Sequence, residues 1–271
     1  MSRRLPGGPL PDDLAVALEA VRPALRLPLA VSWLPAVTST MDLVSAAAVA
    51  GADEGLVLVA DEQTAGRGRR GRAWSSPPGA GLYLSLLLRP PLPVGDTLAL
   101  LTLAAGVGVA AGVREATGLA PGLKWPNDLM IARRKLAGIL AEGIGMGAPG
   151  QAVVLGIGVN VQPAAYPPDV EARATSLEGE LGRAIDRGLL LAAILHGVSD
   201  RYVDLMAGRA GDILQAWRAA APRAVGAAVE WDTPAGARTG VTAGVDDTGA
   251  LLVRTSAGVE RIIAGEVRWV N

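Results

Sequence analysis

One segment of the chain concentrates residues that bind anions. Residues 61–74 read Asp-Glu-Gln-Thr-Ala-Gly-Arg-Gly-Arg-Arg-Gly-Arg-Ala-Trp. Glycine lets backbone N–H groups approach a ligand closely, and the guanidinium fork of arginine pairs with an anion through two parallel contacts. The composition of this segment therefore predicts a site that surrounds one anion. Its arginines are Arg67, Arg69, Arg70 and Arg72, and its glycines are Gly66, Gly68 and Gly71.

The segment differs from the common glycine-rich nucleotide motifs. A GxxxxGK[ST] loop is absent, and the GxGxxG spacing is followed by a tryptophan and a proline-rich turn instead of a helix. Two other interpretations stay open, a solvated arginine loop and an RNA-contacting segment of the Arg-Gly type. Because clustered glycine also predicts mobility, we expect the loop to order around its ligand.

Lysine occurs at only two positions, Lys124 and Lys135, and arginine fills every other basic position. Both lysines fall within one short stretch, 124–138. Arginine does not replace a compact, strongly hydrated ammonium. The bias therefore indicates that these two positions need an ammonium, with chance as the alternative.

The elements that must position these residues are a mixture of helices and strands without regular βαβ alternation, which predicts an α+β domain with a mixed or antiparallel sheet. Glycines at 156 and 158 interrupt one strand, and such glycines indicate a close approach by backbone or ligand. After Pro222 the pattern changes to short strands and turns, which predicts a small β-barrel-like domain. Helices are predicted over 12–25, 39–50, 96–118, 186–206 and 212–220, and strands over 56–60, 82–88, 136–141, 152–161, 225–231, 251–255 and 259–270.

Composition excludes several classes of protein. The chain has 271 residues, 50% of them hydrophobic, and a net charge of −1, which is typical of one large domain plus a small one and gives no global basic field. Without cysteine and with His196 as the single histidine, a thiol nucleophile and a multi-histidine metal centre are excluded. Residues 1–11 lack the apolar core of a secretory peptide and are expected to fray, and the apolar run 98–113 is expected to be a buried helix. These features predict a cytoplasmic protein.

The motifs, taken in order, resemble the biotin protein ligase family, which joins biotin to a lysine of a carboxylase carrier domain. The resemblance covers about 120 residues and implies a class II synthetase-like catalytic domain followed by an SH3-like β-barrel. It implies a division into residues 1–30, 31–221 and 222–271, without an N-terminal DNA-binding domain. The motifs are Ser39-Thr-Met-Asp42, residues 61–74, Leu82-Tyr-Leu-Ser85, Lys124-Trp-Pro-Asn-Asp128, Lys135-Leu-Ala-Gly-Ile139 and Gly156-Ile-Gly-Val-Asn160.

The resemblance also implies a reaction. The biotin carboxylate attacks the α-phosphorus of ATP to give biotinyl-5′-AMP, and a carrier lysine then takes the biotinyl group. Lys135 is implied to lie between the two anions and, with Arg69, to be catalytic. Asp128 is implied to help hold Mg²⁺. The implied ATP-binding residues are Arg69, Arg72, Trp74, Asn127, Asp128, Lys135 and Asn160. The implied biotin-binding residues are Ser39, Thr40, Met41, Gln63, Gly66, Arg67, Gly68, Arg69, Lys135, Gly138 and Gly158.

Two other functions remain alternatives, a lipoate-type acyl ligase and a non-enzymatic RNA-binding module that uses the Arg-Gly loop. The partner implied by the resemblance is a biotin carboxyl carrier protein domain. Neither specific DNA nor a membrane is expected as a partner, and a homodimer is left open.

Overall fold

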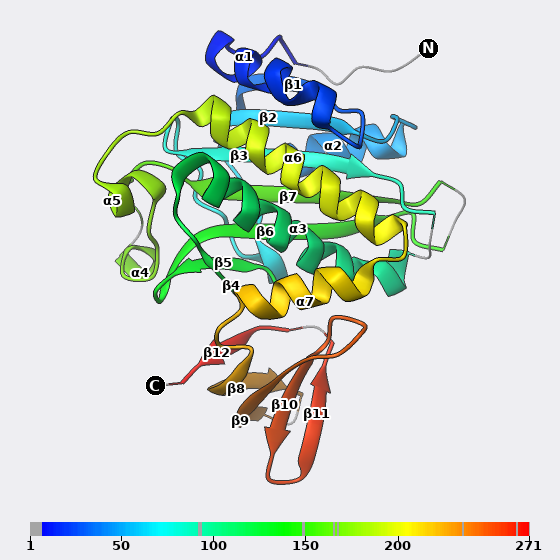
Figure 1. Ribbon diagram of the computed structural model, residues 1–271, viewed down its shortest axis with the longest axis vertical. Coiled ribbons are helices and arrows are strands. Elements are labelled where there is room, and N and C mark those ends of the chain that lie inside the picture. The colour runs from blue at the N-terminus through cyan, green and yellow to red at the C-terminus, as the bar shows by residue number, and fades with distance from the viewer. Residues whose placement is uncertain are drawn as a thin grey trace.

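The computed structural model describes residues 7–91, 94–147, 150–164, 166, 168–234, 236–263 and 265–270. Seven strands form a mixed sheet in the order β1-β2-β3-β7-β6-β5-β4 (Figure 1). Only β1 and β2 pair in parallel, and the other neighbours are antiparallel. The predicted α+β class is therefore confirmed. The strands are β1 (Ala30–Val37), β2 (Leu56–Gln63), β3 (Gly81–Leu88), β4 (Gly122–Lys124), β5 (Asp128–Ile131), β6 (Arg134–Ile144) and β7 (Ala152–Asn160).

Helices cover both faces of this sheet, and they do so unequally. The long helices α3 and α6 pack together over one face, whereas α2 covers only part of the other face (Figure 1). The part of the second face that α2 leaves uncovered lies beneath the Arg-Gly loop, residues 61–74. The helices are α1 (Asp12–Val21), α2 (Thr40–Val49), α3 (Val94–Thr117), α4 (Pro168–Glu171), α5 (Leu177–Leu181), α6 (Arg187–Met206) and α7 (Ala210–Ala220), with two 3-10 turns, η1 (Arg22–Ala24) and η2 (Arg69–Gly71).

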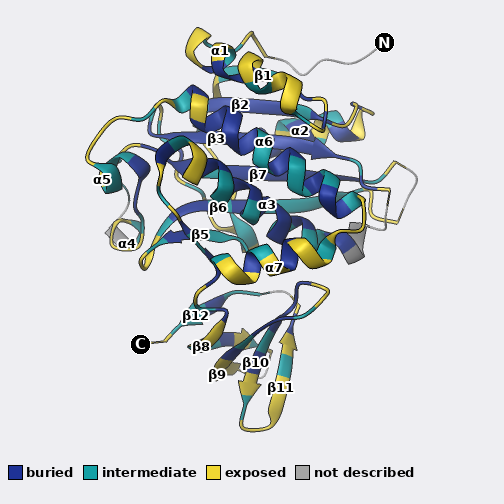
Figure 2. Ribbon diagram, in the orientation of Figure 1, coloured by how far each residue is buried: buried dark blue, intermediate teal, exposed yellow. Residues whose placement is uncertain are grey.

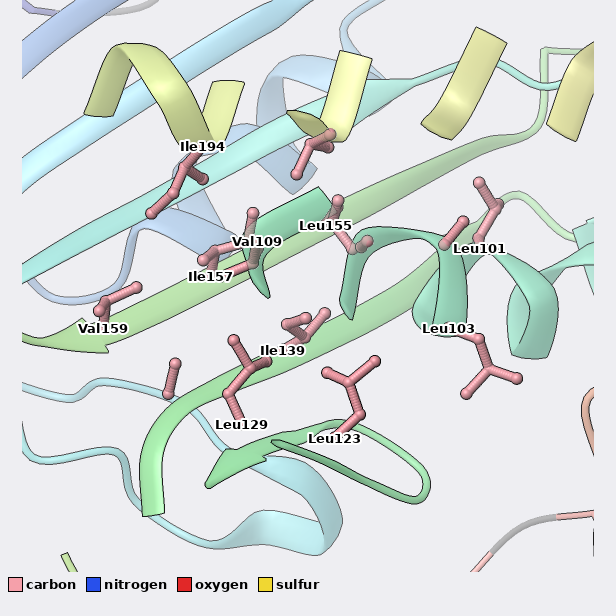
Figure 3. Close-up of a cluster of buried hydrophobic side chains, with 14 of the residues drawn as sticks. Leu101, Leu103, Val109, Leu123, Leu129, Ile139, Leu155, Ile157, Val159 and Ile194 are labelled. Carbon is pink, nitrogen blue, oxygen red and sulfur yellow. The ribbon is translucent and has the colours of Figure 1, made fainter. Parts of the chain in front are cut away.

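The main core lies between the sheet and the α3–α6 pair. Alternate residues of β7, such as Leu155 and Ile157, meet Val109 of α3 and Ile194 of α6 (Figure 3). Burial is densest in these central strands, as Figure 2 shows. A smaller cluster on the other face joins α2 to the sheet through Met41, Val44, Leu58 and Val154.

The glycines of α3 explain its unusual composition. A Cβ on Gly108 would lie 2.6 Å from the carbonyl oxygen of Gly197 in α6, so only glycine permits this contact between the two backbones. The predicted buried helix is therefore present. Helix α3 covers nearly the range 96–118 predicted for it, and its segment Thr97–Thr117 is long and apolar enough to cross a membrane by length and composition. About half of that segment is buried inside the protein.

The small domain is a five-stranded antiparallel sheet in the order β11-β10-β9-β8-β12. The ladders of the described residues leave β11 and β12 as edges, so the predicted barrel-like domain is observed as a sheet without closure. The strand β9 was not predicted because its glycines dilute the apolar pattern, and the strand predicted over 259–270 is two strands. The five are β8 (Val225–Thr233), β9 (Gly236–Val245), β10 (Leu251–Thr255), β11 (Gly258–Ile262) and β12 (Val267–Trp269).

Prolines account for two further differences from the predicted elements. The strand β1 contains Pro35, which hides the strand pattern, but an edge strand tolerates the missing N–H. Helix α1 ends at Val21, and Pro23 lies in the 3-10 turn that follows.

Two predictions, one about the N-terminal segment and one about the start of a helix, also need correction. Gly8 exchanges two backbone hydrogen bonds with Trp33, of 3.0 and 3.2 Å, so part of the segment expected to fray is docked on β1, while residues 1–6 lie outside the described residues. Helix α3 begins at Val94, two residues before the predicted start at residue 96.

Candidate active site

A row of four residues crosses the sheet where α2 leaves it uncovered. Lys124, Asp128, Gly138 and Gly158 lie directly opposite one another on β4, β5, β6 and β7. Residues opposite one another on neighbouring strands point to the same face of a sheet. The cavity row, as we call these four residues, therefore places a cation and a carboxylate beside two positions without side chains.

The indole of Trp74 occupies the space above the two glycines. A Cβ on Gly158 would lie 2.5 Å from Cε2 and Nε1 of Trp74, and one on Gly138 would lie 2.8 Å from Cζ3. A Cβ on Gly156 would likewise lie 2.6 Å from Sδ of Met41. The glycines of β7 were expected to admit a backbone or a ligand, and the structure shows a close approach by two side chains instead, those of Trp74 and Met41.

An open cavity of about 930 Å³ lies beside Trp74, the volume including its mouth to solvent. The structure brings most of the predicted site residues to its wall: Thr40, Met41, Gln63, Arg67, Gly68, Arg69, Arg72, Trp74, Asn127, Asp128, Lys135, Gly138 and Gly158. It adds residues that the resemblance did not assign to biotin or ATP, among them Arg70, Lys124, Trp125, Gly265, Glu266 and Val267. The last three come from the small domain, so the site lies between the two domains.

One end of the cavity carries neutral polar groups. The backbone N–H and the hydroxyl of Thr40 both donate to Oε1 of Gln63, at 2.9 and 3.1 Å, and Nε2 of Gln63 donates to Ser76 at 2.9 Å. The hydroxyl oxygens of Thr40 and Ser85 lie 2.8 Å apart. These bonds hold the amide of Gln63 in one orientation, which suits recognition of a neutral polar ligand in an apolar slot.

Ser39 lies just behind this polar end, outside the cavity lining. It occupies the N-cap position of α2, but its side chain makes no capping hydrogen bond. Its hydroxyl is fully buried and has no hydrogen-bond partner among the described residues. A buried hydroxyl without a partner is costly, which marks Ser39 as a group able to bind an additional polar atom.

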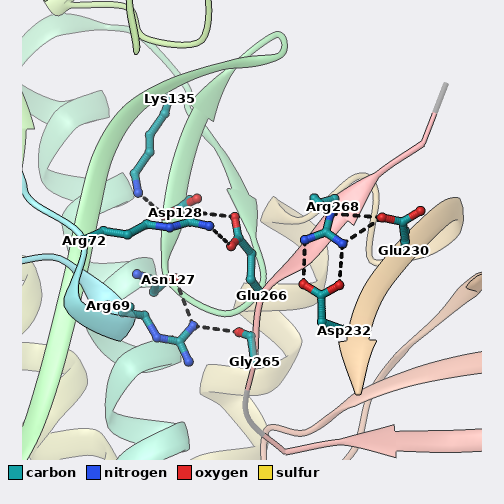
Figure 4. A network of polar contacts seen from close by, with 10 residues as sticks. All are labelled: Arg69, Arg72, Asn127, Asp128, Lys135, Glu230, Asp232, Gly265, Glu266 and Arg268. Atoms are coloured by element: carbon teal, nitrogen blue, oxygen red, sulfur yellow. Dashed lines mark hydrogen bonds and ion pairs between the residues drawn. The ribbon is translucent and has the colours of Figure 1, made fainter. Parts of the chain in front are cut away.

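The other end of the cavity is charged (Figure 4). Nζ of Lys135 lies 2.5 Å from Oδ1 of Asp128. Nη1 of Arg69 donates to Oδ1 of Asn127 at 3.3 Å and to the carbonyl of Gly265 at 3.2 Å. The arginine therefore ties the loop to the β4–β5 turn and to the small domain at once.

The guanidinium of Arg72 makes a two-point contact with the carboxylate of Glu266, in which Nη1 lies 2.8 Å from Oε1. This contact is a second link between the Arg-Gly loop and the small domain. Burial would raise the pKa of Glu266, but the hydrogen bond and charge of Arg72 outweigh it and hold that pKa below its usual value.

Cations dominate the cavity wall, since six face it against the two carboxylates of Asp128 and Glu266. Burial lowers the pKa of Arg69 and of Lys124, and the nearby charge of Asp128 opposes the effect of burial on both. Buried positive charge of this kind attracts an anionic ligand strongly. Among the described residues, no cluster of three or more histidine or acidic side chains is arranged to hold a metal.

Arg67 anchors the outer side of the Arg-Gly loop. Its guanidinium pairs with Asp42 of α2 at 2.8 Å and with Glu142 of β6 at 2.6 Å. The loop is closed internally by backbone bonds, including one of 2.8 Å from Trp74 N–H to the carbonyl of Gly66. A Cβ on Gly66 would lie 2.4 Å from the carbonyl oxygen of Trp74, so this glycine serves the loop itself and lies outside the main cavity.

Asn160 lies outside the lining of the main cavity. Its Nδ2 donates to the carbonyl of Thr175 at 2.9 Å and to that of Lys135 at 3.3 Å. In this structure the side chain holds the backbone that carries Lys135, and the contact with nucleotide implied for it stays a prediction. His196 lies on α6, 3.6 Å from Asp200, and takes no part in the cavity.

Comparison with known proteins shows which families share this architecture. The profile of the Biotin/lipoate A/B protein ligase family matches residues 33–160, and that of the biotin protein ligase C-terminal domain matches residues 229–268. The two matches correspond to the catalytic domain with its cavity and to the small domain that completes it.

Individual relatives and a solved structure support the same family assignment. The biotin–[acetyl-CoA-carboxylase] ligase of Paracoccus denitrificans is 39% identical over 221 residues, which cover 78% of this chain and 88% of the relative. The bifunctional ligase/repressor BirA of Bacillus subtilis is 39% identical over 218 residues, and the chain spans 66% of the length of that relative. The Aquifex aeolicus biotin protein ligase, solved in complex with biotin and ATP, superposes with a TM-score of 0.76 at 30% identity, covering 89% of this chain and 98% of that one. The chain belongs to the biotin protein ligase family.

Proposed function

We propose that the protein is an ATP-dependent biotin protein ligase that forms biotinyl-5′-AMP and transfers the biotinyl group to a lysine of a carrier domain. The observation that carries the proposal is a single cavity with a neutral polar end, at Thr40 and Gln63, and a cationic end, at Lys135 and Arg69. A ligand with an uncharged head and a carboxylate tail fits that polarity. The tail would then meet the nucleotide at the cationic end.

The chemistry of the first step follows from charge. A carboxylate attacking the α-phosphorus of ATP brings two anions together, so the barrier falls if cations neutralise both and hold them in line. The ammonium of Lys135 is compact and has three donors, which suits a position shared by two anions. Arg69 would add a second positive charge, and the expelled pyrophosphate carries away the bonding electron pair.

In the second step, the amine of a carrier lysine attacks the carbonyl carbon of the mixed anhydride, AMP leaves, and the new amide loses a proton. The chain needs no nucleophile of its own, which agrees with the absence of cysteine. The folded Arg-Gly loop and the indole of Trp74 would keep water from the anhydride.

Biotin is favoured over lipoate by two observations. The Thr40–Gln63–Ser76 chain of hydrogen bonds and the buried hydroxyl of Ser39 offer partners for a ureido group, which lipoate lacks. The small domain also matches the biotin ligase C-terminal profile. The arginines that would make the loop an RNA-binding segment instead face the cavity or pair with carboxylates of this chain, as Arg67 and Arg72 do.

The remaining parts of the proposal concern metal and partners. Asp128 fits Mg²⁺, because nucleotide sites bind this ion through one or two carboxylates and phosphate oxygens. Bound there, the ion would neutralise phosphate charge. The proposed partner is a biotin carboxyl carrier protein domain, and we propose a cytoplasmic location, where ATP and this carrier are available. The absence of specific DNA binding stays a prediction that a shift assay tests, and sedimentation tests the homodimer.

The deciding experiment is biotin-dependent exchange between ATP and labelled pyrophosphate. Exchange with biotin but not with lipoate, followed by labelling of a carrier domain and not of its lysine-to-arginine variant, is the expected result. Lipoate-dependent exchange would assign the chain to the lipoate ligases. No exchange with either acid, together with tight binding of RNA, would support the RNA-binding alternative.

A further inference from the structure

Lys135 faces the cavity because the strand that carries it contains a β-bulge. Side chains alternate between the two faces of a regular strand, so Lys135 and Gly138 of β6, three residues apart, should lie on opposite faces. The register of β5 and β6 shows where this alternation is broken. Leu129 of β5 lies opposite Ala137. The next residue of β5 lies opposite Lys135, so β6 contains one extra residue between these two positions.

The extra residue is Leu136, and its burial shows what the bulge does. Leu136 and Ala137 are both fully buried in the main core, on the far side of the sheet from the cavity. Without the bulge, Leu136 would share the cavity face with Gly138, and Lys135 would point into the apolar core. Bulges next to active sites redirect single side chains in this way. The bulge therefore decides on which side of the sheet the ammonium lies.

A short segment outside the sheet holds the backbone of Lys135 at the bulge. The β6–β7 ladder begins only at Ala137, and residues 173–175 take the place of β7 beside Lys135. The N–H of Lys135 donates to the carbonyl of Arg173 at 2.6 Å, and its carbonyl accepts the N–H of Thr175 at 2.9 Å. The 173–175 segment thus satisfies both backbone groups of Lys135 where the regular ladder stops.

Glu180 of the short helix α5 in turn fixes the 173–175 segment. Its Oε1 accepts a hydrogen bond from the hydroxyl of Thr175 and another from Nη2 of Arg134, at 2.7 Å. The carboxylate therefore joins the segment to β6 next to Lys135. Arg134 is half exposed, and an exposed ion pair contributes little, whereas Thr175 is buried. The bond to Thr175 is therefore the stronger of the two constraints.

The side chain of Lys135 runs from the end of β6 to Asp128 (Figure 4). A Cβ on Gly138 would lie 3.2 Å from its Nζ, so the ammonium lies over a residue of the cavity row. Nζ also lies 5.2 Å from the ring centroid of Trp74. Asp128 and Trp74 hold the charged end of the side chain, and the bulge fixes its other end.

We propose that Thr175 and Glu180 are positioning residues, which maintain the bulge at Leu136 and so keep the ammonium of Lys135 in the cavity. The inference rests on the proposed function, in which Lys135 neutralises the two anions of the first step. It deepens that function, because it gives a role in this step to α5 and the 173–175 segment, neither of which lines the main cavity.

The position of Lys135 can be measured without any reaction, because the chain has only two lysines. Protein made with isotopically labelled lysine gives two sets of side-chain NMR signals, which Lys135→Arg assigns. The ring current of Trp74 should shift the signal of Lys135, and that of Trp269, 5.1 Å from Nζ of Lys124, should shift the other. Thr175→Val and Glu180→Leu should remove most of the shift of Lys135 and leave that of Lys124 unchanged.

Biotin-dependent ATP–pyrophosphate exchange measures the consequence for the reaction. Thr175→Val and Glu180→Leu should slow exchange by up to about a hundredfold, the cost of misplacing a group at the reacting centre by about 1 Å. Thr175→Ser, which keeps the hydroxyl, should restore most of the rate. Adding Glu180→Leu to Lys135→Arg should slow exchange no further, because both substitutions act through the same ammonium.

Glu178→Leu is the matched control. Glu178 lies in the same helix, and its Oε1 accepts the N–H of Ile185 at 3.1 Å, so it holds α5 to the chain that follows and not to the 173–175 segment. This variant should lose stability as Glu180→Leu does, since each loses a hydrogen-bonded carboxylate. It should keep the wild-type Lys135 signal and exchange rate. If Glu180→Leu does not fold, Thr175→Val, which removes only a hydroxyl, decides the test.

A Lys135 signal that keeps its ring-current shift in both Thr175→Val and Glu180→Leu would overturn the proposal. An equal loss of exchange in Glu178→Leu would also overturn it, because destabilisation of α5 alone would then explain the effect. If the wild-type protein catalyses no biotin-dependent exchange, the proposed function fails instead. The NMR measurement would still decide whether Thr175 and Glu180 hold Lys135 in the cavity.

Discussion

Nζ of Lys135 lies 2.5 Å from Oδ1 of Asp128, and both side chains face the cavity between the two domains. The side chains are 33% and 19% exposed, so the pair is well enough solvated to contribute little to stability. The main effect of the ion pair is on position, because the carboxylate of Asp128 holds the flexible ammonium of Lys135 in the cavity, where the proposed function needs it. Incoming anions would compete with Asp128 for the same three donors.

We expect Lys135→Arg to reduce biotin-dependent ATP–pyrophosphate exchange by about a hundredfold, the effect of misplacing one charge-stabilising donor in an active site. A planar guanidinium cannot sit between two anions as an ammonium does. Stability should change little, because the side chain is partly solvated. Exchange rates and thermal unfolding measure the two effects separately.

Arg134→Lys is the matched control for this substitution. Arg134 precedes Lys135 on β6 but pairs with Glu180 at 2.7 Å, away from the cavity wall. Its replacement should leave exchange unchanged. A Lys135→Arg protein with normal exchange and normal stability would remove Lys135 from the site.

Arg69→Gly is expected to speed release of the adenylate. The guanidinium of Arg69 joins the loop to Asn127 and to the carbonyl of Gly265, so its loss frees the loop from both neighbours. A rapid-quench measurement of adenylate dissociation should show an increase of about tenfold, as expected for one or two lost hydrogen bonds to a charged group.

Arg70→Gly provides the comparison for Arg69. Arg70 has a positive φ of 57°, which glycine adopts without strain, so the substitution changes the charge and keeps the backbone. Adenylate dissociation should change less than in Arg69→Gly. Equal off-rates in the two variants would mean that loop charge, and not the two tethers, retains the intermediate.

Much of this site could be predicted from sequence because its parts are local. The glycines at 156 and 158 indicated a close approach to one strand, and the two lysines within residues 124–138 indicated positions that need an ammonium. The partner that fills the glycine gap, Trp74, was placed at the nucleotide end by resemblance alone. Nothing in the spacing of the residues required its indole to lie across β6 and β7.

The contribution of the small domain could not be predicted. Gly265 and Glu266 lie almost two hundred residues from the arginines they contact, and a single Gly-Glu pair near the end of a chain carries no pattern. The charge composition did not indicate a cationic cavity either. The net charge is −1, because acidic residues elsewhere in the chain balance the cations of the cavity. The unpartnered hydroxyl of Ser39 could not be predicted for a similar reason, because local sequence does not show which buried hydroxyl lacks a hydrogen-bond partner.

Replacing Glu266 with Gln should weaken the link between the loop and the small domain in a pH-dependent way. The folded protein holds the pKa of Glu266 below its usual value, because Arg72 outweighs the effect of burial. A lowered folded-state pKa stabilises the protein above the unfolded pKa, and this stabilisation is lost as pH falls through the folded value. The variant should therefore be less stable than wild type near pH 7 by about 0.5–1 kcal/mol, the value of a well-formed but partly solvated ion pair.

Urea unfolding from pH 7 down to about pH 3, the acid side of a glutamate titration, measures this difference. The two proteins should converge in stability at the acid end. A difference that is constant with pH would contradict the ion pair, since it would come from packing. Arg72→Gln should abolish the same pH dependence, because it removes the other half of the pair.

Gly158→Ala tests whether the two glycines of the cavity row, Gly138 and Gly158, make room for the indole of Trp74. The added Cβ would lie 2.5 Å from Cε2 and Nε1 of the indole, which leaves no room for the ring in its present place. Overpacking of this kind costs about 1–3 kcal/mol, so we expect loss of stability together with weaker ATP binding by calorimetry.

Gly211→Ala is the matched control, because no atom lies within 4 Å of its Cβ position and the residue is in helix α7. That substitution should raise helix stability by up to about 1 kcal/mol and leave ATP binding alone. If Gly158→Ala bound ATP normally, the indole would have no role in holding the nucleotide, and the two glycines of the cavity row would serve packing only.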